Sequence, residues 1–151
     1  LVNVRSNVHL VSLAFPFLKQ SKSSAITMLT STAGESLTPI YSNVDCLSNV
    51  QQLIKCTALE GAHFGIRVNG VAAGVTYTKA RLNKDSFGMN FTKEQNETFF
   101  RLAAQKVPLN KTINSAKDCA ASILFLSSED ASIITGEILT VDGGQSLATN
   151  T

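Results

Sequence analysis

The sequence is poor in several features that mark particular classes of protein. Among its 151 residues it has no tryptophan, three cysteines, three prolines and only 16% charged side chains. No apolar run is long enough to cross a bilayer. The 13 basic and 11 acidic residues are spread along the chain, and no basic stripe alternates with aromatic residues. We therefore expect no nucleic acid and no membrane as a partner.

Cysteine and histidine are too few and too scattered to form a metal site. Cys46, Cys56 and Cys119 are an odd number without the spacing of a ligand pair. His9 and His63 have no cysteine or carboxylate at metal-ligand spacing. Nothing in the chain resembles a signal peptide. We expect free thiols in a reducing compartment, a cytoplasmic protein and no bound metal.

The hydrophobic pattern alternates between helix and strand. In several segments apolar residues recur every three or four positions, which predicts helices. Pro16 should kink or shorten the first of these helices, and Gly61 stands where the second should end. Short apolar, β-branched runs predict buried strands. Because these strands alternate with helices, we expect them to be parallel and joined by right-handed crossovers. The predicted helices are 2–18, 43–61, 93–105 and 116–127, and the predicted strands are 25–30, 66–71 and 138–141.

Four segments, in the right order and spacing, resemble the short-chain dehydrogenase/reductase family. Residues 133–144, which end in Asp142-Gly143-Gly144, look like the passage into and out of its last strand, and 65–71 look like its sixth strand. Residues 3–5 and 108–111 are similar to the segments that open two of its helices. The resemblance implies an α/β fold: the C-terminal part of a Rossmann-like, doubly wound parallel sheet whose N-terminal strands are absent.

The resemblance covers nearly the whole chain and sets the expected domain. It implies one partial domain over residues 1–151, with a lid at about 76–105 that selects the substrate. Because Leu1 opens directly onto a helical pattern and domains seldom begin inside an element, we expect sequence to be missing upstream.

The family's chemistry can be carried over residue by residue. In the family a tyrosine acts as general acid or base on a carbonyl or alcohol, and a serine hydrogen-bonds the same oxygen. A lysine four residues after the tyrosine lowers the phenol's pKa, and an asparagine supports a relay water. The asparagine corresponds to Asn3 and the serine to Ser31. If the resemblance is set aside, Asn3 is simply a polar residue near the start of a helix, and Ser31 is a turn former after a strand.

The tyrosine and lysine positions do not match the family. Counting back from the end of the second helix places them at Asn43 and Leu47, and counting forward from Ser31 places them at Val44 and Ser48. The only nearby phenol is Tyr41, our remaining candidate for the catalytic acid or base.

The surroundings of Tyr41 are unfavourable for that role. A free phenol has a pKa near ~10, so it needs a neighbouring cation to act at neutral pH. Four residues on lies Asp45, which would raise the pKa, and Lys55 lies about three turns further along the helix. We expect the acid–base step to be lost.

Cofactor binding is implied only by the resemblance. Gly74 and Thr78 match the family positions that contact the nicotinamide end, although Ala73 replaces the family's proline. The alternative is a plain loop between strand and lid. The family's glycine-rich phosphate turn has no counterpart, and we expect that Gly143-Gly144 cannot serve because it follows the last strand and opens no helix. The cofactor is therefore NAD or NADP, or none.

Three functions remain open. The first is a catalytically inactive relative with a structural or assembly role, pairing as the family does through helices 2–18 and 43–61 and through the last helix and strand. The second is an NAD(P)-dependent oxidoreductase of carbonyls or alcohols whose N-terminal half is not in this sequence. The third is a ligand-binding module that uses the lid. The strand at 25–30 would have a bare edge, so we expect it to be covered by the rest of its own chain, by another subunit or by a larger assembly. The partner is then a second copy in a homo-oligomer or the other subunits of that assembly.

Overall fold

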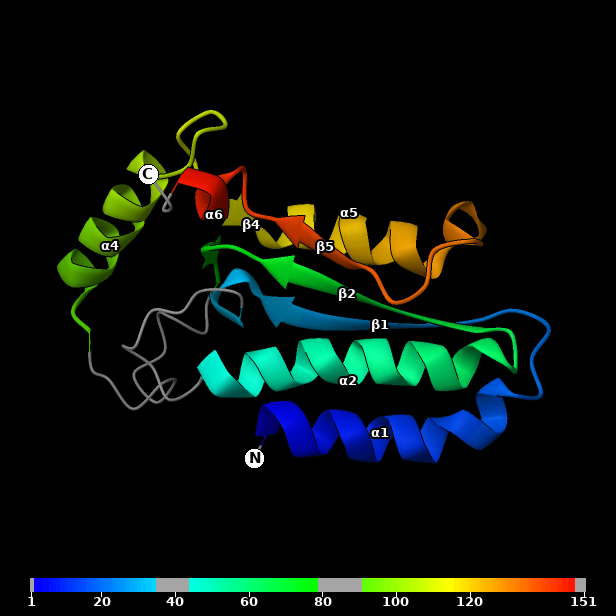
Figure 1. The fold of residues 1–151 in the computed structure, drawn as a ribbon. Coiled ribbons are helices and arrows are strands. Elements are labelled where there is room, and N and C mark those ends of the chain that lie inside the picture. The colour runs from blue at the N-terminus through cyan, green and yellow to red at the C-terminus, as the bar shows by residue number, and fades with distance from the viewer. Residues whose placement is uncertain (1, 35–43, 79–90, 149–151) are drawn as a thin grey trace.

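A three-stranded parallel sheet organises the chain. The computed structural model describes residues 2–34, 44–78 and 91–148. The sheet has the order β1-β2-β5, with Ser24 of β1 opposite Ile66 of β2 and Gly70 of β2 opposite Ile138 of β5 (Figure 1). Its strands are β1 (Ser24–Ser31), β2 (Ile66–Ala73) and β5 (Ile138–Val141), and a second, two-stranded sheet joins β3 (Thr76–Tyr77) to β4 (Asn114–Ser115).

The helices agree closely with the sequence prediction. Pro16 lies inside the first helix and does not end it. Two short 3-10 helices and the four-residue α6 were not predicted. The helices are α1 (Val2–Leu18), α2 (Val44–Ala62), α4 (Lys93–Gln105), α5 (Ala116–Ser127) and α6 (Gln145–Ala148), with 3-10 helices η1 (Thr32–Gly34) and η3 (Glu129–Ala131). None of these described helices is long and apolar enough to cross a membrane.

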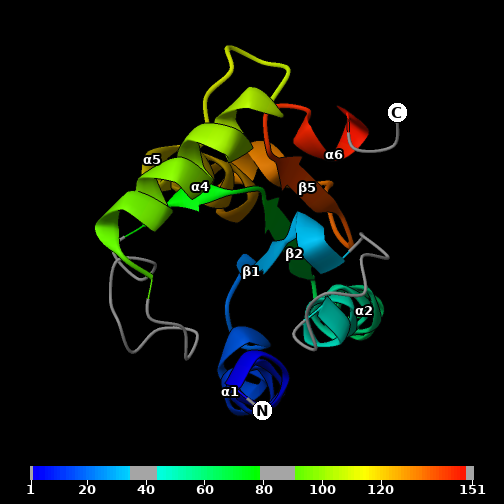
Figure 2. The ribbon, with the colours of Figure 1, turned by 90° about the vertical axis from the view of Figure 1, so that its left-hand side faces the viewer.

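The helices cover the two faces of the sheet unequally. Figure 2 shows α2 and α1 on one side of the strands and α5 on the other. The chain steps across the sheet in one direction, from β1 to β2 to β5, yet α2 and α5 lie on opposite faces. The two crossovers therefore have opposite hands. The prediction that all are right-handed is wrong for one of them, because the long excursion from residue 74 to 115 lets the chain change faces before α5 begins.

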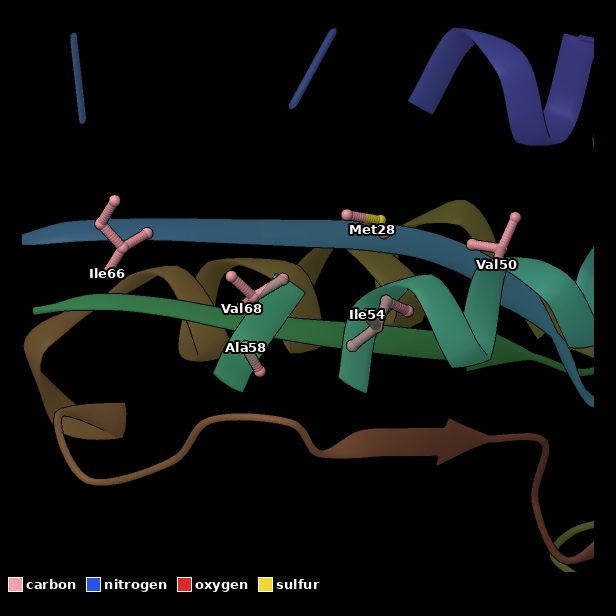
Figure 3. Close-up of a cluster of buried hydrophobic side chains, with 6 residues drawn as sticks. All are labelled: Met28, Val50, Ile54, Ala58, Ile66 and Val68. Atoms are coloured by element: carbon pink, nitrogen blue, oxygen red, sulfur yellow. The ribbon is translucent and has the colours of Figure 1, made fainter. Parts of the chain in front are cut away.

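The main core lies between the sheet and α2. Met28, Val50, Ile54, Ala58, Ile66 and Val68 form one buried cluster (Figure 3). Ile54 is fully buried, and a Cβ on Gly70 would come within 2.6 Å of its Cδ1, so the glycine lets α2 lie close to β2. Packing of this apolar helix face against buried strands is what selects the two periodicities seen in the sequence.

Gly61 has a different role from the one the sequence suggested. The helix continues past it to Ala62, and the chain turns at Gly65, whose φ is +70°. A Cβ on Gly61 would lie 2.9 Å from the carbonyl oxygen of Ile66. Gly61 therefore allows close packing of α2 against the start of β2, and Gly65 provides the left-handed turn.

Side-chain hydrogen bonds fix the start of α4 and the end of α5. At the start of α4, Thr92 Oγ1 accepts from the Gln95 backbone at 3.2 Å and Gln95 Oε1 accepts from the Thr92 backbone at 2.8 Å. At the end of α5, Arg67 of β2 donates to the carbonyl oxygens of Leu126 and Ser128 at 2.8 and 2.9 Å. Arg67 thus ties α5 to the sheet, which places the N-terminal half of α5 beside the strand ends.

Candidate active site

An open pocket lies at the carboxyl ends of β1 and β2, where α5 forms the opposite wall. Its volume is about 380 Å³. In open parallel sheets, ligands commonly bind outside the carboxyl ends of the strands. Three of the five predicted site residues, Ser31, Gly74 and Thr78, line this one pocket. The other lining residues are Leu29, Thr30, Ala73, Thr76, Ala116, Cys119, Ala120 and Ile123.

Ser31 ends β1 and begins the turn that follows. Its Oγ accepts a hydrogen bond from the Ala33 backbone at 3.2 Å, and its carbonyl oxygen accepts one from Gln51 Nε2 at 3.4 Å. The hydroxyl is half-buried at the pocket wall. Ser31 therefore acts as a turn former, while its hydroxyl hydrogen remains able to donate to a bound oxygen.

Gly74 is held by the neighbouring strand. Its backbone N–H donates to the Val141 carbonyl at 2.8 Å, and its carbonyl accepts from Thr76 Oγ1 at 2.9 Å. A Cβ at this position would lie 2.6 Å from the Cβ of Asp142. Strand packing alone therefore requires a glycine here, whether or not a cofactor binds. Thr78 is exposed at the pocket rim.

Asn3 is not among the described residues that line the pocket. Asn3 is exposed in the first turn of α1, and its carbonyl oxygen accepts from the side-chain amide of Asn7. The N-terminal end of α1 does lie at the same end of the sheet as the strand tips (Figure 1). Tyr41 lies outside the described residues, as does Asn43, the family tyrosine position by one alignment.

The described residues that line the pocket carry hydroxyls but no charge. The ionisable group among them is the thiol of Cys119, which is 7% exposed and lies 3.9 Å from Thr76 Oγ1. The single lysine of α2, Lys55, is exposed and eleven residues beyond the start of the helix, about 16 Å along its axis. The lining groups can orient a polar ligand, but they supply no cation to lower the pKa of a phenol.

The turn after β5 differs from the sequence expectation. Gly143-Gly144 does open a helix, the four-residue α6. Its amides are already used: Asp142 accepts from the Gly144 and Ser146 backbone N–H groups at 2.8 Å each. Burial tends to raise the pKa of Asp142, but the hydrogen bonds from Ser146, Gly144 and Gln145 outweigh it and hold the pKa below its ordinary value. These two amides therefore donate to the protein's own carboxylate and are not available to a bound anion.

The sequence analysis missed several groups that shape the site. Cys119 and Thr76 form part of the wall, and Asn114 holds the rim by donating to the Val141 carbonyl from its side chain. The sequence could have indicated this wall, because Ala116, Cys119, Ala120 and Ile123 of α5 recur at the spacing of one helix face. No group of three or more histidine, cysteine or acidic residues could hold a metal among the described residues.

Comparison with known proteins identifies the architecture. Residues 1–146 match the family model described as enoyl-(acyl carrier protein) reductase. The chain is 34% identical, over 94% of its length, to Tropinone reductase homolog At2g29170 of Arabidopsis thaliana, of which it spans 48%. Across the first three curated relatives it spans 34–49% of their length.

Solved structures give the same answer. An oxidoreductase of the short-chain dehydrogenase/reductase family from Burkholderia thailandensis superposes with a TM-score of 0.80 at 27% identity, over 95% of this chain and 53% of that one. ElxO with NADP bound superposes with a TM-score of 0.79 at 27% identity, over 95% and 54%. The alternating elements, the parallel sheet and these matches agree: the chain belongs to the short-chain dehydrogenase/reductase family.

Proposed function

We propose that this chain is a catalytically inactive member of the family with a structural or assembly role. The observation that carries the proposal is the composition of α2. The family's lysine should lie in its first turns, four residues after the tyrosine, yet the only lysine in α2 is the exposed Lys55. Without that cation, a phenol near the start of α2 would keep a pKa near ~10 and transfer protons poorly at neutral pH.

The residues that line the pocket also favour a catalytically inactive protein. Because none of the described residues that line it is ionic, none of them replaces the family's lysine. The described core cluster and the cap of α4 use residues other than the candidate catalytic positions, and Ser31 takes part in the sheet register through its backbone, opposite Ala73. Packing and catalysis use different residues, so a family member can lose one and keep the other.

The outer faces of α1 and α2 are suited to assembly. Leu13 and Phe17 of α1 are 57% and 74% exposed, and Leu59 of α2 is 75% exposed. The resemblance implies pairing through these two helices, and apolar side chains clustered at a surface often mark an interaction site. We propose a homo-oligomer or a subunit of a larger assembly, which fits the structural role.

The test is an activity assay with a restored active site. The purified protein should oxidise neither NADPH nor NADH with aldehyde and ketone substrates above the protein-free rate. The variant Tyr41→Phe should behave identically. Turnover by the unaltered protein that Tyr41→Phe abolishes would overturn the proposal. As a positive comparison, Asn43→Tyr with Leu47→Lys restores the family pair in one alignment, and Val44→Tyr with Ser48→Lys restores it in the other.

A second candidate is an NAD(P)-dependent oxidoreductase acting on a carbonyl or alcohol. It is favoured by the gathering of Ser31, Gly74 and Thr78 around one pocket and by the likeness to a structure with NADP bound. The hydroxyls of Thr76 and Thr78 suit the carboxamide of a nicotinamide, which would supply hydride chemistry when bound. At the α6 turn the Gly144 and Ser146 amides already donate to Asp142, so they are not available to a cofactor diphosphate. A rise in melting temperature with NADP or NAD would favour this candidate.

A further inference from the structure

A short turn at the end of β5 holds the chain on both sides of the excursion between β2 and α5. The Val141 carbonyl oxygen accepts a hydrogen bond from the Gly74 backbone N–H at 2.8 Å, where the excursion begins. The same oxygen accepts from the side-chain amide of Asn114, where the excursion ends. Figure 1 shows α6, which follows this turn, beside the loop that leads from α4 to β4. We call residues 141–145 the anchor turn, because they join both ends of the excursion to the sheet.

The anchor turn packs tightly against the segment that follows α4. The Gly143 carbonyl oxygen accepts from the Leu109 backbone N–H at 3.0 Å. A Cβ on Gly143 would lie 2.5 Å from Val107 Cγ1, so there is no space for a side chain between the two segments. Asp142 fixes the shape of the turn, because its carboxylate accepts from two backbone N–H groups at 2.8 Å each. A change in the anchor turn must therefore displace the end of the excursion as well.

The start of the excursion connects the anchor turn to the pocket and to α4. Gln145 Oε1 accepts from the Val75 backbone N–H at 3.5 Å. The next residue, Thr76, begins β3 and lines the pocket. Tyr77 of β3 contacts α4, since its ring centroid lies 5.1 Å from that of Phe100. Part of the pocket wall and α4 therefore share an attachment to the anchor turn.

The helix α4 is weakly held along its own length. Of its 13 residues, those that are buried are Asn96, Phe100 and Ala103. Asn96 is 4% exposed, and its Oδ1 has no hydrogen-bond partner among the described residues. A buried oxygen without a donor destabilises the packed position, because outward movement of the helix would let water donate to it. The position of α4 therefore depends on how the two ends of the excursion are held.

We propose that the anchor turn is a latch that holds α4 and β3 in the position seen here. When the turn is displaced, α4 and β3 loosen together, and because Thr76 of β3 belongs to the pocket wall, the pocket becomes more accessible. Segments that open locally are those with few buried contacts, as α4 has. The latch consists of packing and backbone contacts, so it is independent of whether the protein is an enzyme.

Two glycines that flank β5 provide a matched test of the latch. Gly143 and Gly136 have φ values of +62° and +78°, so alanine is strained at both positions. An added Cβ at Gly143 would collide with Val107, whereas at Gly136 the nearest atom is the Ala58 Cβ at an ordinary 3.6 Å. Hydrogen exchange of the purified protein, followed by mass spectrometry, should show the α4 amides exchanging about tenfold faster or more in Gly143→Ala. In Gly136→Ala they should exchange as in the wild type, with the α1 amides as internal reference in both variants.

A second pair of variants measures access to the pocket without straining the backbone. Gln145→Ala removes the acceptor of the Val75 N–H, and Leu147→Ala is the control on the same helix, because Leu147 is 77% exposed. Cys119, which lines the pocket and is 7% exposed, is the probe once the other two cysteines are replaced by serine. Iodoacetamide should alkylate it about threefold faster in Gln145→Ala and at the wild-type rate in Leu147→Ala.

Two results would show that the anchor turn is not a latch. One is an exchange rate of the α4 amides that Gly143→Ala and Gly136→Ala change to the same extent. The other is an alkylation rate of Cys119 that is the same in Gln145→Ala and Leu147→Ala. If Gly143→Ala does not fold, the alkylation rates of the second pair decide the question.

Discussion

The substitution Gly74→Ala tests whether residue 74 is a glycine because of strand packing or because of cofactor binding. An added Cβ would lie 2.6 Å from Asp142 Cβ and 2.9 Å from Asp142 Cα, so β2 and β5 must move apart by about 0.8 Å to reach ordinary contact. Overpacking of this kind costs about 1–3 kcal/mol. The lower entropy of the unfolded chain with alanine offsets about 0.4–1 kcal/mol of that. We expect a net loss of about 1–2 kcal/mol in the free energy of unfolding, with no cofactor present.

The assay is urea unfolding followed by far-ultraviolet circular dichroism. The midpoint should fall while the dependence on urea concentration stays constant, because the surface exposed on unfolding is the same. Gly65→Ala is the comparison: nothing lies within 4 Å of its added Cβ, so only the strain of its positive φ is measured. If Gly74→Ala is as stable as the unaltered protein, strand packing does not explain this glycine.

Three further perturbations test how other residues stabilise the fold. Asn110 has a φ of 56°, so Asn110→Val should lower stability by about 1–2 kcal/mol and Asn110→Gly should not, as measured by urea unfolding. Arg67→Met leaves the Leu126 and Ser128 carbonyls without their donor, and should cost about 1–3 kcal/mol in the same assay. Folding lowers the pKa of Asp142, so its carboxylate stabilises the folded chain at pH values above the ordinary pKa of 3.8. This stabilisation is lost as the pH falls below that value. Asp142→Asn should flatten the acid limb of a plot of stability against pH; an unchanged limb would contradict this account.

The sequence predicted elements better than their connections. Helix bounds at α1, α4 and α5 and the bounds of β5 follow directly from periodicity, because a helix or strand must bury one face. The hand of the crossover to β5 could not be predicted, since it depends on which face α5 packs against after a long excursion. Gly61 was misread for a similar reason: a helix stop and a close helix–strand contact both select glycine.

Of the candidate site residues, those near the ends of strands lie around one pocket. Ser31, Gly74 and Thr78 meet at one pocket because β1 and β2 are parallel neighbours, which the pattern of strands implied. The Asp142 turn could not be read in this way. The same Asp-Gly-Gly letters are compatible with an open anion site or with a carboxylate that caps its own helix, and only the hydrogen bonds from Gly144 and Ser146 decide.

The core contacts that the structure describes along α2 use positions other than those that correspond to the family's tyrosine and lysine. The cluster that holds α2 to the sheet uses Val50, Ile54 and Ala58, and Gly61 makes the close contact at its end. We expect these contacts to hold α2 to the sheet whichever residues stand at the family's tyrosine and lysine positions. Restoring a tyrosine and a lysine there should therefore leave the chain folded, with a free energy of unfolding close to that of the unaltered protein as measured by urea unfolding. If both restored pairs unfold the protein instead, the start of α2 has been recruited into packing, and its role has moved from chemistry to structure.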